Sequence, residues 1–239
     1  MLEDLDGQTP GQEPWRRQFR QFIPRPASST MGRPAPWAGV APGRRRVISC
    51  ETVKADLTPR LVPAESEPDD RPHAAVLVPI FERDGQATLV LIRRGFMLSS
   101  SPGDLAFPGG RIEAGERAVD AAVRESEEEV ALRPETLTLL GRLSGVSRPR
   151  FPGWVAPYVA LLDSEPSLVP APVEVDGVLT VSLADLAADG AFWQEEWDVP
   201  GQGERLLSFF ATASLGHDVI WGLTARIVTE LLSELLLGA

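Results

Sequence analysis

Three glutamates at helical spacing are the residues with the clearest capacity for chemistry. Glu125, Glu128 and Glu129 stand at positions i, i+3 and i+4, which share one face of an α-helix. Two such charges ~4 Å apart repel by about 1 kcal/mol in water and about 4 kcal/mol at an effective dielectric of 20. A divalent cation relieves that repulsion on a partly buried face, and oxygen-only ligands select a hard ion such as Mg²⁺ or Mn²⁺ over zinc. Helix geometry alone still favours a solvated acidic face.

A glycine-containing loop precedes these glutamates and shifts the balance toward a metal site. The consecutive Gly109 and Gly110 allow the backbone to approach a ligand closely, and their carbonyls can bind a hard cation. Glu116 follows Gly110 by six residues. Arg124 lies four residues before Glu128, where its guanidinium can brace the carboxylates.

The spacing of this region resembles the box of the Nudix hydrolases. Six polar and glycine positions match in register: Gly110, Glu116, Arg124, Glu125, Glu128 and Glu129. Two positions depart, because Ser126 replaces an apolar residue and Ala131 replaces a glycine. That glycine usually permits a left-handed helix exit, which costs alanine about 1–2 kcal/mol if the geometry is kept.

A longer resemblance is to the coenzyme A pyrophosphatases of the same superfamily. Its upstream part runs from Leu91 to Gly110, and similar downstream segments are Glu174-Val175 and 220–225. Ile92 stands where that motif usually has threonine, and Ser101 where it has histidine. These departures leave the expected fold unchanged and weaken the case for coenzyme A itself.

The resemblance implies a fold, a reaction and a set of roles. The implied fold belongs to the α/β class and is a Nudix-type α/β/α sandwich with a mixed sheet. The catalytic loop and helix would follow the third or fourth strand of that sheet. The reaction is metal-dependent hydrolysis of a nucleoside diphosphate linkage. Glu125 and Glu129 would bind metal directly, Glu128 directly or through water, and the Gly109 carbonyl would be a further ligand. Glu116 would pair with Arg124 or hold a metal-bound water. Glu125 or Glu128 would be the general base.

Residues that flank the loop are candidates for binding substrate. Arg93, Arg111, Gly109 and Gly110 are expected to contact phosphate, whereas Arg94 fits a surface position better. Within 147–157, the residues Arg148, Arg150, Phe151 and Trp154 could wall an adenine, although core packing suits Trp154 better. Glu174 could hold an extra metal or the water. No catalytic role is expected for His73, His217 or Cys50, and Trp193 and Trp197 could form a flap or an interface patch.

Strands and helices with clear periodicity must position these residues. Apolar runs predict strands at 74–81 and 87–93, which form a hairpin, then 138–146, 154–162, 177–181 and 205–211. Residues 94–115 are expected to be loop. Helical stripes predict a helix over 116–132, ended by Pro134, and a terminal helix over 221–237. A short helix is expected at 185–188, and another around 15–23.

Composition limits the class of protein. The 239 residues carry 34 acids and 23 bases, a net charge of −11, which argues against a general nucleic-acid binder. Residues 1–50 hold eight arginines and four acids, and we expect a flexible Pro- and Arg-rich tail there, with one domain over 51–239. A single cysteine excludes an internal disulfide and a cysteine zinc cluster. The chain shows neither a membrane-length apolar stretch nor a leader, so we expect a cytoplasmic protein.

Three functions remain open at this stage. The first is a Mg²⁺- or Mn²⁺-dependent pyrophosphohydrolase of coenzyme A or a derivative, and a homodimer is the family-style expectation. The second keeps the chemistry but acts on NADH, ADP-ribose or a nucleoside triphosphate. The third is a domain that binds a nucleotide without hydrolysing it, which the intact glutamates argue against.

Overall fold

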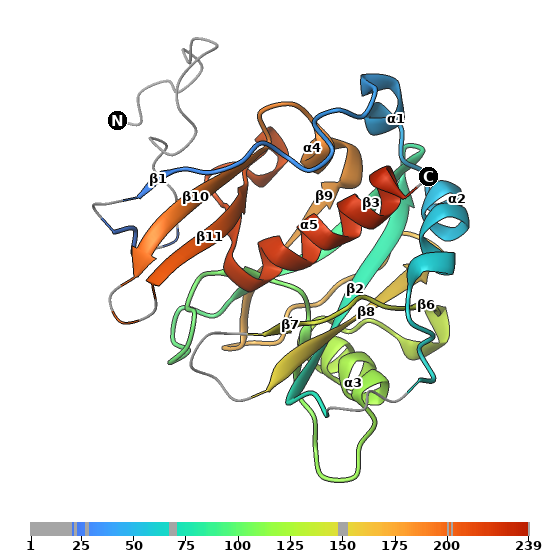
Figure 1. Ribbon diagram of the computed structural model, residues 1–239. Coiled ribbons are helices and arrows are strands. Elements are labelled where there is room, and N and C mark those ends of the chain that lie inside the picture. The colour runs from blue at the N-terminus through green and yellow to red at the C-terminus, as the bar shows by residue number, and fades with distance from the viewer. Residues whose placement is uncertain are drawn as a thin grey trace, which may run out of the picture.

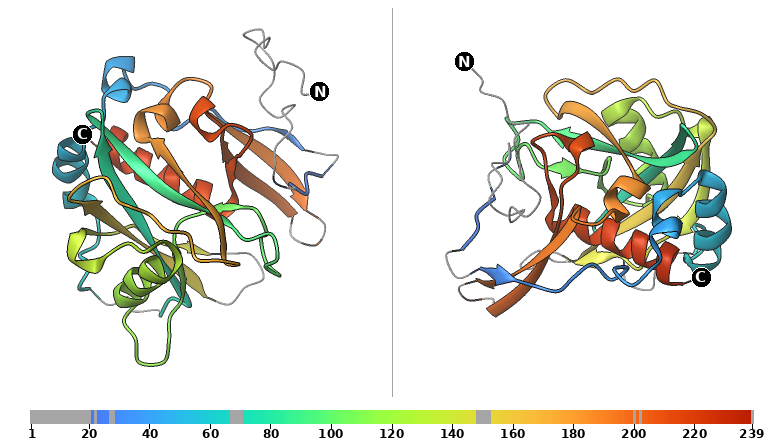
Figure 2. Two further views of the ribbon diagram at one scale, coloured as in Figure 1. Left: turned by 180° about the vertical axis from the view of Figure 1, so that it is seen from behind. Right: turned by 90° about the horizontal axis from the view of Figure 1, so that it is seen from above.

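A mixed β-sheet between two long helices forms the centre of the molecule (Figure 1). The computed structural model describes residues 21, 23–26, 29–66, 71–147, 153–199, 201 and 203–238. Helix α3 (Ala118–Val130) lies on one face of the sheet and α5 (Gly222–Leu237) on the other, as the view from behind also shows (Figure 2). This arrangement confirms the expected α/β class.

The central strands follow the predicted apolar runs. Strands β2 (Ala74–Arg83) and β3 (Gln86–Arg94) form the expected hairpin through a two-residue turn. Strand β8 (Trp154–Leu162) runs parallel to β2, and β6 (Leu137–Arg142) and β9 (Val175–Ser182) extend the sheet at its two sides. The strand predicted over 138–146 is broken, because β7 (Val146–Ser147) pairs separately with β8.

Two short strands lie inside the segment predicted as loop. Strand β4 (Leu105–Ala106) pairs with β3, and β5 (Gly109–Arg111) pairs with the beginning of β2. The loop and helix that carry the glutamates therefore follow the fourth strand of the main sheet in chain order, as expected. Strands β4 and β5 are too short to show alternating hydrophobicity in the sequence.

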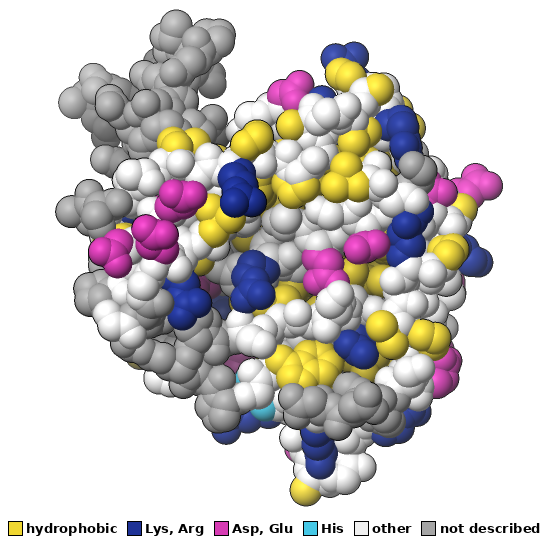
Figure 3. Space-filling model, viewed as in Figure 1, with side chains coloured by type: hydrophobic (Ala, Val, Ile, Leu, Met, Phe, Trp, Pro, Cys, Tyr) yellow, Lys and Arg dark blue, Asp and Glu magenta, His cyan; other side chains and the backbone are white. Residues whose placement is uncertain are grey.

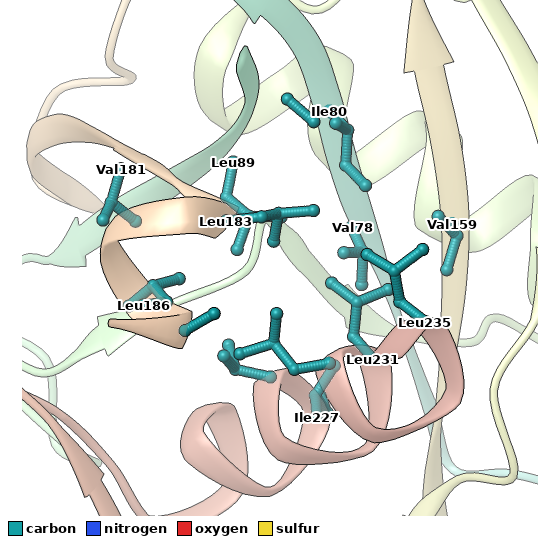
Figure 4. Close-up of a cluster of buried hydrophobic side chains, with 14 of the residues drawn as sticks. Val78, Ile80, Leu89, Val159, Val181, Leu183, Leu186, Ile227, Leu231 and Leu235 are labelled. Atoms are coloured by element: carbon teal, nitrogen blue, oxygen red, sulfur yellow. The ribbon is translucent and has the colours of Figure 1, made fainter. Parts of the chain in front are cut away.

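Apolar side chains from the sheet and two helices form the larger core. Val78, Ile80, Leu89 and Val159 point from the strands toward Ile227, Leu231 and Leu235 of α5 (Figure 4). Leu183 and Leu186 of α4 (Leu183–Ala187) close one end of this core.

A second core lies on the opposite face of the sheet, where Val119, Ala122 and Val130 of α3 pack against Leu77 and Val90. The two predicted helices thus bury the stripes that identified them.

A second sheet explains the tryptophan-containing segment. It has the order β1 (Thr30–Met31), β10 (Phe192–Val199), β11 (Gly203–Phe210), β12 (Ile220–Trp221). Trp193 and Trp197 are buried on one face of β10, with Glu195 buried between them. They are core residues here, and neither a flap nor an interface patch. The buried glutamate masks the alternating pattern in the sequence.

The expected flexible tail over 1–50 is wrong for most of the described residues up to Cys50. Trp37 and Ile48 are each 1% exposed, and Trp37 contacts the rings of Phe192 and Phe210. Short helices α1 (Pro42–Arg46) and α2 (Cys50–Thr52) follow, continued by helical turns at Val53–Leu57 and Thr58–Arg60. Prolines shape an irregular path that nevertheless packs, because isolated large side chains reach the core.

Some sequence predictions lie outside the described residues. These are most of the helix expected around 15–23, and Arg148, Arg150 and Phe151. In the part of the chain that the structure describes, no helix is both long and apolar enough to cross a membrane.

Candidate active site

Gly109 and Gly110 bring the loop into direct contact with a strand and with the acidic helix. Gly109 has a φ of +151°, and a Cβ atom there would overlap the carbonyl oxygen of Ala75 on β2. A Cβ atom on Gly110 would overlap the carboxylate of Glu125. Both positions therefore need glycine, the first for its backbone conformation and close strand pairing, the second to admit a carboxylate.

Glu129 is the most buried carboxylate of the site, with 6% of its surface exposed. The Gly109 N–H donates a hydrogen bond of 2.9 Å to its Oε2 atom. Burial raises the pKa of Glu129 to about 7, against the lowering effect of that hydrogen bond. Negative charge on Glu125 and Glu174 adds to the rise, and the positive charge of Arg94 opposes it. The loop and the helix are thus joined through a carboxylate that lacks full charge compensation.

Glu125 is a neighbour of Glu129, and burial disfavours its charged form as well. Burial raises the pKa of Glu125, and the guanidinium of Arg124 counteracts part of that rise. The charges of Glu128 and Glu174 raise the pKa of Glu125 further. Two carboxylates that repel one another at the bottom of a glycine loop form an environment that favours a cation.

Arg124 is the hub of the hydrogen bonds on this face. Its Nε donates to Glu116 Oε1 at 2.8 Å, and its Nη2 donates to Glu116 Oε2 and to the Arg111 carbonyl, each at 3.2 Å. Its Nη1 donates to Glu125 at 3.0 Å and to Glu128 at 3.1 Å. The hydrogen bond with Glu116, and after it the one with Glu125, raises the pKa of Arg124 above its usual range.

Glu116 completes this arrangement from the loop. The hydrogen bond with Arg124 lowers the pKa of Glu116, and the Glu113 N–H donates a further bond of 2.9 Å. The pairing with Arg124 is one of the two roles that the sequence resemblance implies for Glu116. Arg124 therefore links the loop before α3 to three carboxylates, since Glu125 and Glu128 share its other nitrogens.

The donor set matches a hard divalent cation in chemistry and charge. The buried Glu129 and the half-buried Glu125 supply oxygen atoms from a mutually repelling pair, whose repulsion a cation would relieve. The side chain of Glu128 is 58% exposed and is turned onto Arg124. Across the described residues, no three His, Cys, Asp or Glu side chains already converge as a metal-binding group. The oxygen donors of Glu125 and Glu129 suit a hard cation, whereas the third carboxylate, that of Glu128, points toward Arg124.

The flanking residues differ in how well they suit contact with substrate. The side chain of Arg111 is exposed beside the loop. Arg93 instead forms ion pairs with Asp218 and Asp176, which favours a structural role over the predicted phosphate contact. Arg94 lies close enough to Glu129 to influence its pKa, so it is a better candidate than its sequence context indicates.

Other candidates fall in places that a sequence cannot show. Glu174, exposed in a turn before β9, acts electrostatically on both Glu125 and Glu129. Trp154 is half-buried under the guanidinium of Arg142, 5.1 Å from its ring centroid, which favours packing over an adenine wall. Burial and then Glu82 raise the pKa of Cys50 to about 11, so its thiol remains protonated and unreactive.

Comparisons with known proteins show the family to which the chain belongs. Residues 71–199 match the model of the NUDIX domain. An uncharacterized Nudix hydrolase, NudL, from Photorhabdus laumondii is 34% identical over 168 residues, which cover 70% of this chain and 86% of that protein. Nudix hydrolase 3 of Caenorhabditis elegans is 33% identical over 138 residues, 56% of each chain. A MutT/nudix family protein from Enterococcus faecalis has a similar structure, with a TM-score of 0.45, 20% identity, and coverage of 71% of this chain and 64% of that one.

The chain therefore belongs to the Nudix family. It is a pyrophosphohydrolase that acts on a nucleotide, and enzymes of this family generally use divalent metal ions.

Proposed function

We propose that the chain hydrolyses the diphosphate of coenzyme A or a derivative, with Mg²⁺ or Mn²⁺, to 3′,5′-ADP and a 4′-phosphopantetheine product. The observation that carries the hydrolytic chemistry is the junction of loop and helix, where Gly110 lies against Glu125 and Gly109 binds Glu129. The resemblance of residues 91–110 and 220–225 to coenzyme A pyrophosphatases supports the choice of substrate. The two segments meet in the fold, where Trp221 donates a hydrogen bond to Asp104.

The proposed roles follow the environments of the carboxylates. Glu125 and Glu129 would hold the cation, and the Gly109 carbonyl would be a further ligand. Glu128, which is turned onto Arg124, would bind the cation through water or directly after leaving Arg124. Divalent ions held by these residues would neutralise charge on the diphosphate and lower the pKa of the attacking water. Glu125 or Glu128 accepts the proton of that water as its oxygen bonds to phosphorus and the bridging P–O bond breaks.

Two residues keep these carboxylates in place, and one contacts substrate. Arg124 fixes Glu125 and Glu128 through one nitrogen, and Glu116 fixes Arg124 through two. Arg111 is exposed at the end of the loop, where its guanidinium can bind a phosphate oxygen.

A second substrate class is the alternative. Ile92 and Ser101 differ in residue type from the coenzyme A motif. A related domain, that of Shewanella oneidensis NrtR, has been crystallised with ADP-ribose. ADP-ribose, NADH or a nucleoside triphosphate would then replace coenzyme A.

A turnover assay tests these possibilities together. The purified protein is offered coenzyme A, NADH, ADP-ribose and dNTPs with Mg²⁺ or Mn²⁺, and products are separated by chromatography. We expect coenzyme A to be cleaved fastest and Glu125→Gln to lower kcat by about 100-fold or more. Glu127→Gln is the matched control, because Glu127 is exposed on the same helix and takes no part in these hydrogen bonds.

The outcomes separate the alternatives. Turnover of another nucleotide without coenzyme A cleavage would overturn the substrate assignment. Nucleotide binding with no turnover of any substrate would support a purely binding domain. Equal activity of the Glu125 and Glu127 variants would overturn the site.

Two further expectations accompany this proposal. The family resemblance favours a homodimer, which sedimentation velocity would measure directly. The sequence also favours a cytoplasmic location, which fractionation of the source cells would check.

A further inference from the structure

One short segment near the C-terminus makes three side-chain contacts with β3, with β4 and with the residue just before β4. We call this segment, Asp218–Thr224, the C-terminal turn; it contains β12 and the beginning of α5. The indole Nε1 of Trp221 donates to Asp104 Oδ1 at 2.9 Å. The hydroxyl of Thr224 donates to the Leu105 carbonyl, also at 2.9 Å. Asp218 forms an ion pair with Arg93 on β3.

These contacts are buried or half-buried, and aromatic rings pack against the Trp221 indole that makes one of them. Asp218 is 3% exposed and Thr224 is 6% exposed. The ring of Trp221 stacks on Phe209, with centroids 6.5 Å apart and planes 6° apart. It also leans against Trp197 at 6.4 Å. The indole N–H is consequently aimed by an aromatic cluster, and its direction does not depend on Asp104 alone.

The groups that receive these contacts lie next to the catalytic glycines. Arg93 and Leu105 are partners across the β3–β4 pair, so the C-terminal turn holds both strands. Asp104 also closes the loop that begins at Arg94, since its carbonyl accepts the Arg94 N–H at 3.0 Å. The chain then passes through Phe107, 3% exposed, to Gly109. Between Asp104 and Gly109 there are only four residues, too few to decouple the glycines from the contact.

We infer that the C-terminal turn positions the Gly109–Gly110 loop against Glu125 and Glu129, and that the Trp221–Asp104 hydrogen bond is its principal tie. Asp104 and Arg93 are then positioning residues that act through the loop. This inference rests on the proposed hydrolysis for its kinetic consequences. Its structural consequence is independent of substrate, because the Gly109 N–H is itself hydrogen-bonded to Glu129.

Two substitutions at one position test the hydrogen bond. Asp104→Ala removes the acceptor of the Trp221 N–H, whereas Asp104→Asn keeps an Oδ1 acceptor in the same place. Both leave the backbone bonds of residue 104 available. Glu165→Ala serves as a control, because it removes a partner of Arg83, at the far end of β2 from the loop.

The first measurement is amide hydrogen exchange of residues 105–111 in the full-length protein. We expect Asp104→Ala to speed exchange in this segment by about tenfold while the amides of β8 remain protected. Asp104→Asn and Glu165→Ala should exchange as the unaltered protein does. Unchanged exchange in Asp104→Ala would overturn the inference, whatever the enzyme hydrolyses.

The second measurement is steady-state kinetics on the best substrate. A misplaced loop should lower kcat by about 10- to 100-fold in Asp104→Ala, with KM changed by about threefold or less. Asp104→Asn should recover most of kcat. A loss that Asn does not rescue would contradict the role of the hydrogen bond. Faster exchange in Asp104→Ala together with an inactive unaltered protein would support the positioning role and reject the proposed hydrolysis.

Discussion

At the scale of single residues, the site consists of carboxylates whose charges one arginine organises. Arg124 contacts Glu116, Glu125 and Glu128 at 2.8–3.2 Å. Glu129 depends on the Gly109 N–H instead. The sequence predicted the bracing role of Arg124 from helical spacing, but spacing cannot show that Glu129 is buried and Glu128 exposed. The two differ because Glu129 faces the loop, whereas Glu128 faces outward along the helix.

Replacing Arg124 tests that organisation. In Arg124→Lys the positive charge remains, but a single ammonium cannot bridge Glu116 to two further carboxylates. We expect kcat for the best substrate to fall by about 10- to 100-fold, because the metal-binding carboxylates lose their orientation. Steady-state kinetics measure the effect. Arg133→Ala, on an exposed arginine just beyond α3, should leave kcat unchanged, and an equal loss in both variants would contradict the prediction.

At the scale of elements, α3 shows how the two departures from the Nudix box are accommodated. Ser126 is fully buried, and its hydroxyl donates to the Ala122 carbonyl at 2.6 Å, so its polarity is satisfied within the helix. Ala131 takes the left-handed conformation, φ 57° and ψ 32°, that the pattern assigns to glycine. The helix exit is therefore kept, and alanine bears the conformational cost.

Substituting this alanine should stabilise the protein. In Ala131→Gly the strain of about 1–2 kcal/mol is relieved, and the greater freedom of glycine in the unfolded chain offsets part of the gain. We expect the free energy of unfolding in urea to rise by about 0.5–1 kcal/mol. Ala121→Gly, in the middle of the same helix, should lower it by about 1 kcal/mol or more. A loss of stability in Ala131→Gly would show that its backbone is unstrained.

At the scale of the whole molecule, the N-terminal segment completes the domain by packing against the second sheet. Trp37 packs on Phe192 and Phe210 of the second sheet. Arg25 reaches Glu195 on β10 through two hydrogen bonds of 2.7 Å.

The net charge of −11 is not gathered into one patch on the face that carries α5, where acidic and basic side chains are interspersed (Figure 3).

The burial of Trp37 predicts a large effect on stability. Trp37→Ala removes a side chain that is 1% exposed, and we expect the free energy of unfolding to fall by about 3–5 kcal/mol. Val47→Ala is the control from the same segment, because Val47 is 64% exposed. Thermal and urea unfolding measure both variants. A small effect of Trp37→Ala would instead support the flexible tail that the sequence predicts for this segment.

The buried ion pair with Arg25 predicts a dependence on pH. Burial raises the pKa of Glu195, but hydrogen bonds from Arg25, Trp193 and Trp197 outweigh it, so the net pKa lies below its usual value. Such a group stabilises the fold above its unfolded pKa of about 4.3, and the contribution is lost as the pH falls through the folded pKa.

Urea unfolding of Glu195→Gln between pH 7 and pH 3 measures this contribution. We expect the substitution to lower the free energy of unfolding by about 3 kcal/mol at pH 7. The difference from the unaltered protein should be constant down to about pH 5 and shrink below about pH 4. A difference that stays constant to pH 3 would show that ionisation of Glu195 is not its source.

The sequence by itself determined the family resemblance, the two long helices and most strands of the main sheet. Those features depend on local spacing: the glutamates at i, i+3 and i+4, the stripes of α3 and α5, and the apolar runs of β2 and β8. Local spacing is written directly in the chain, so it can be found without knowing the fold.

Only the tertiary structure decided which side chains meet across the fold. Arg93, for which the sequence predicts a phosphate contact, forms an ion pair with Asp218, and Trp221 donates a hydrogen bond to Asp104. Trp193 and Trp197 are buried on either side of Glu195, and Arg25, far away in sequence, compensates the charge of that glutamate. Burial and charge compensation depend on neighbours that are distant in the chain, and one sequence carries no record of those neighbours.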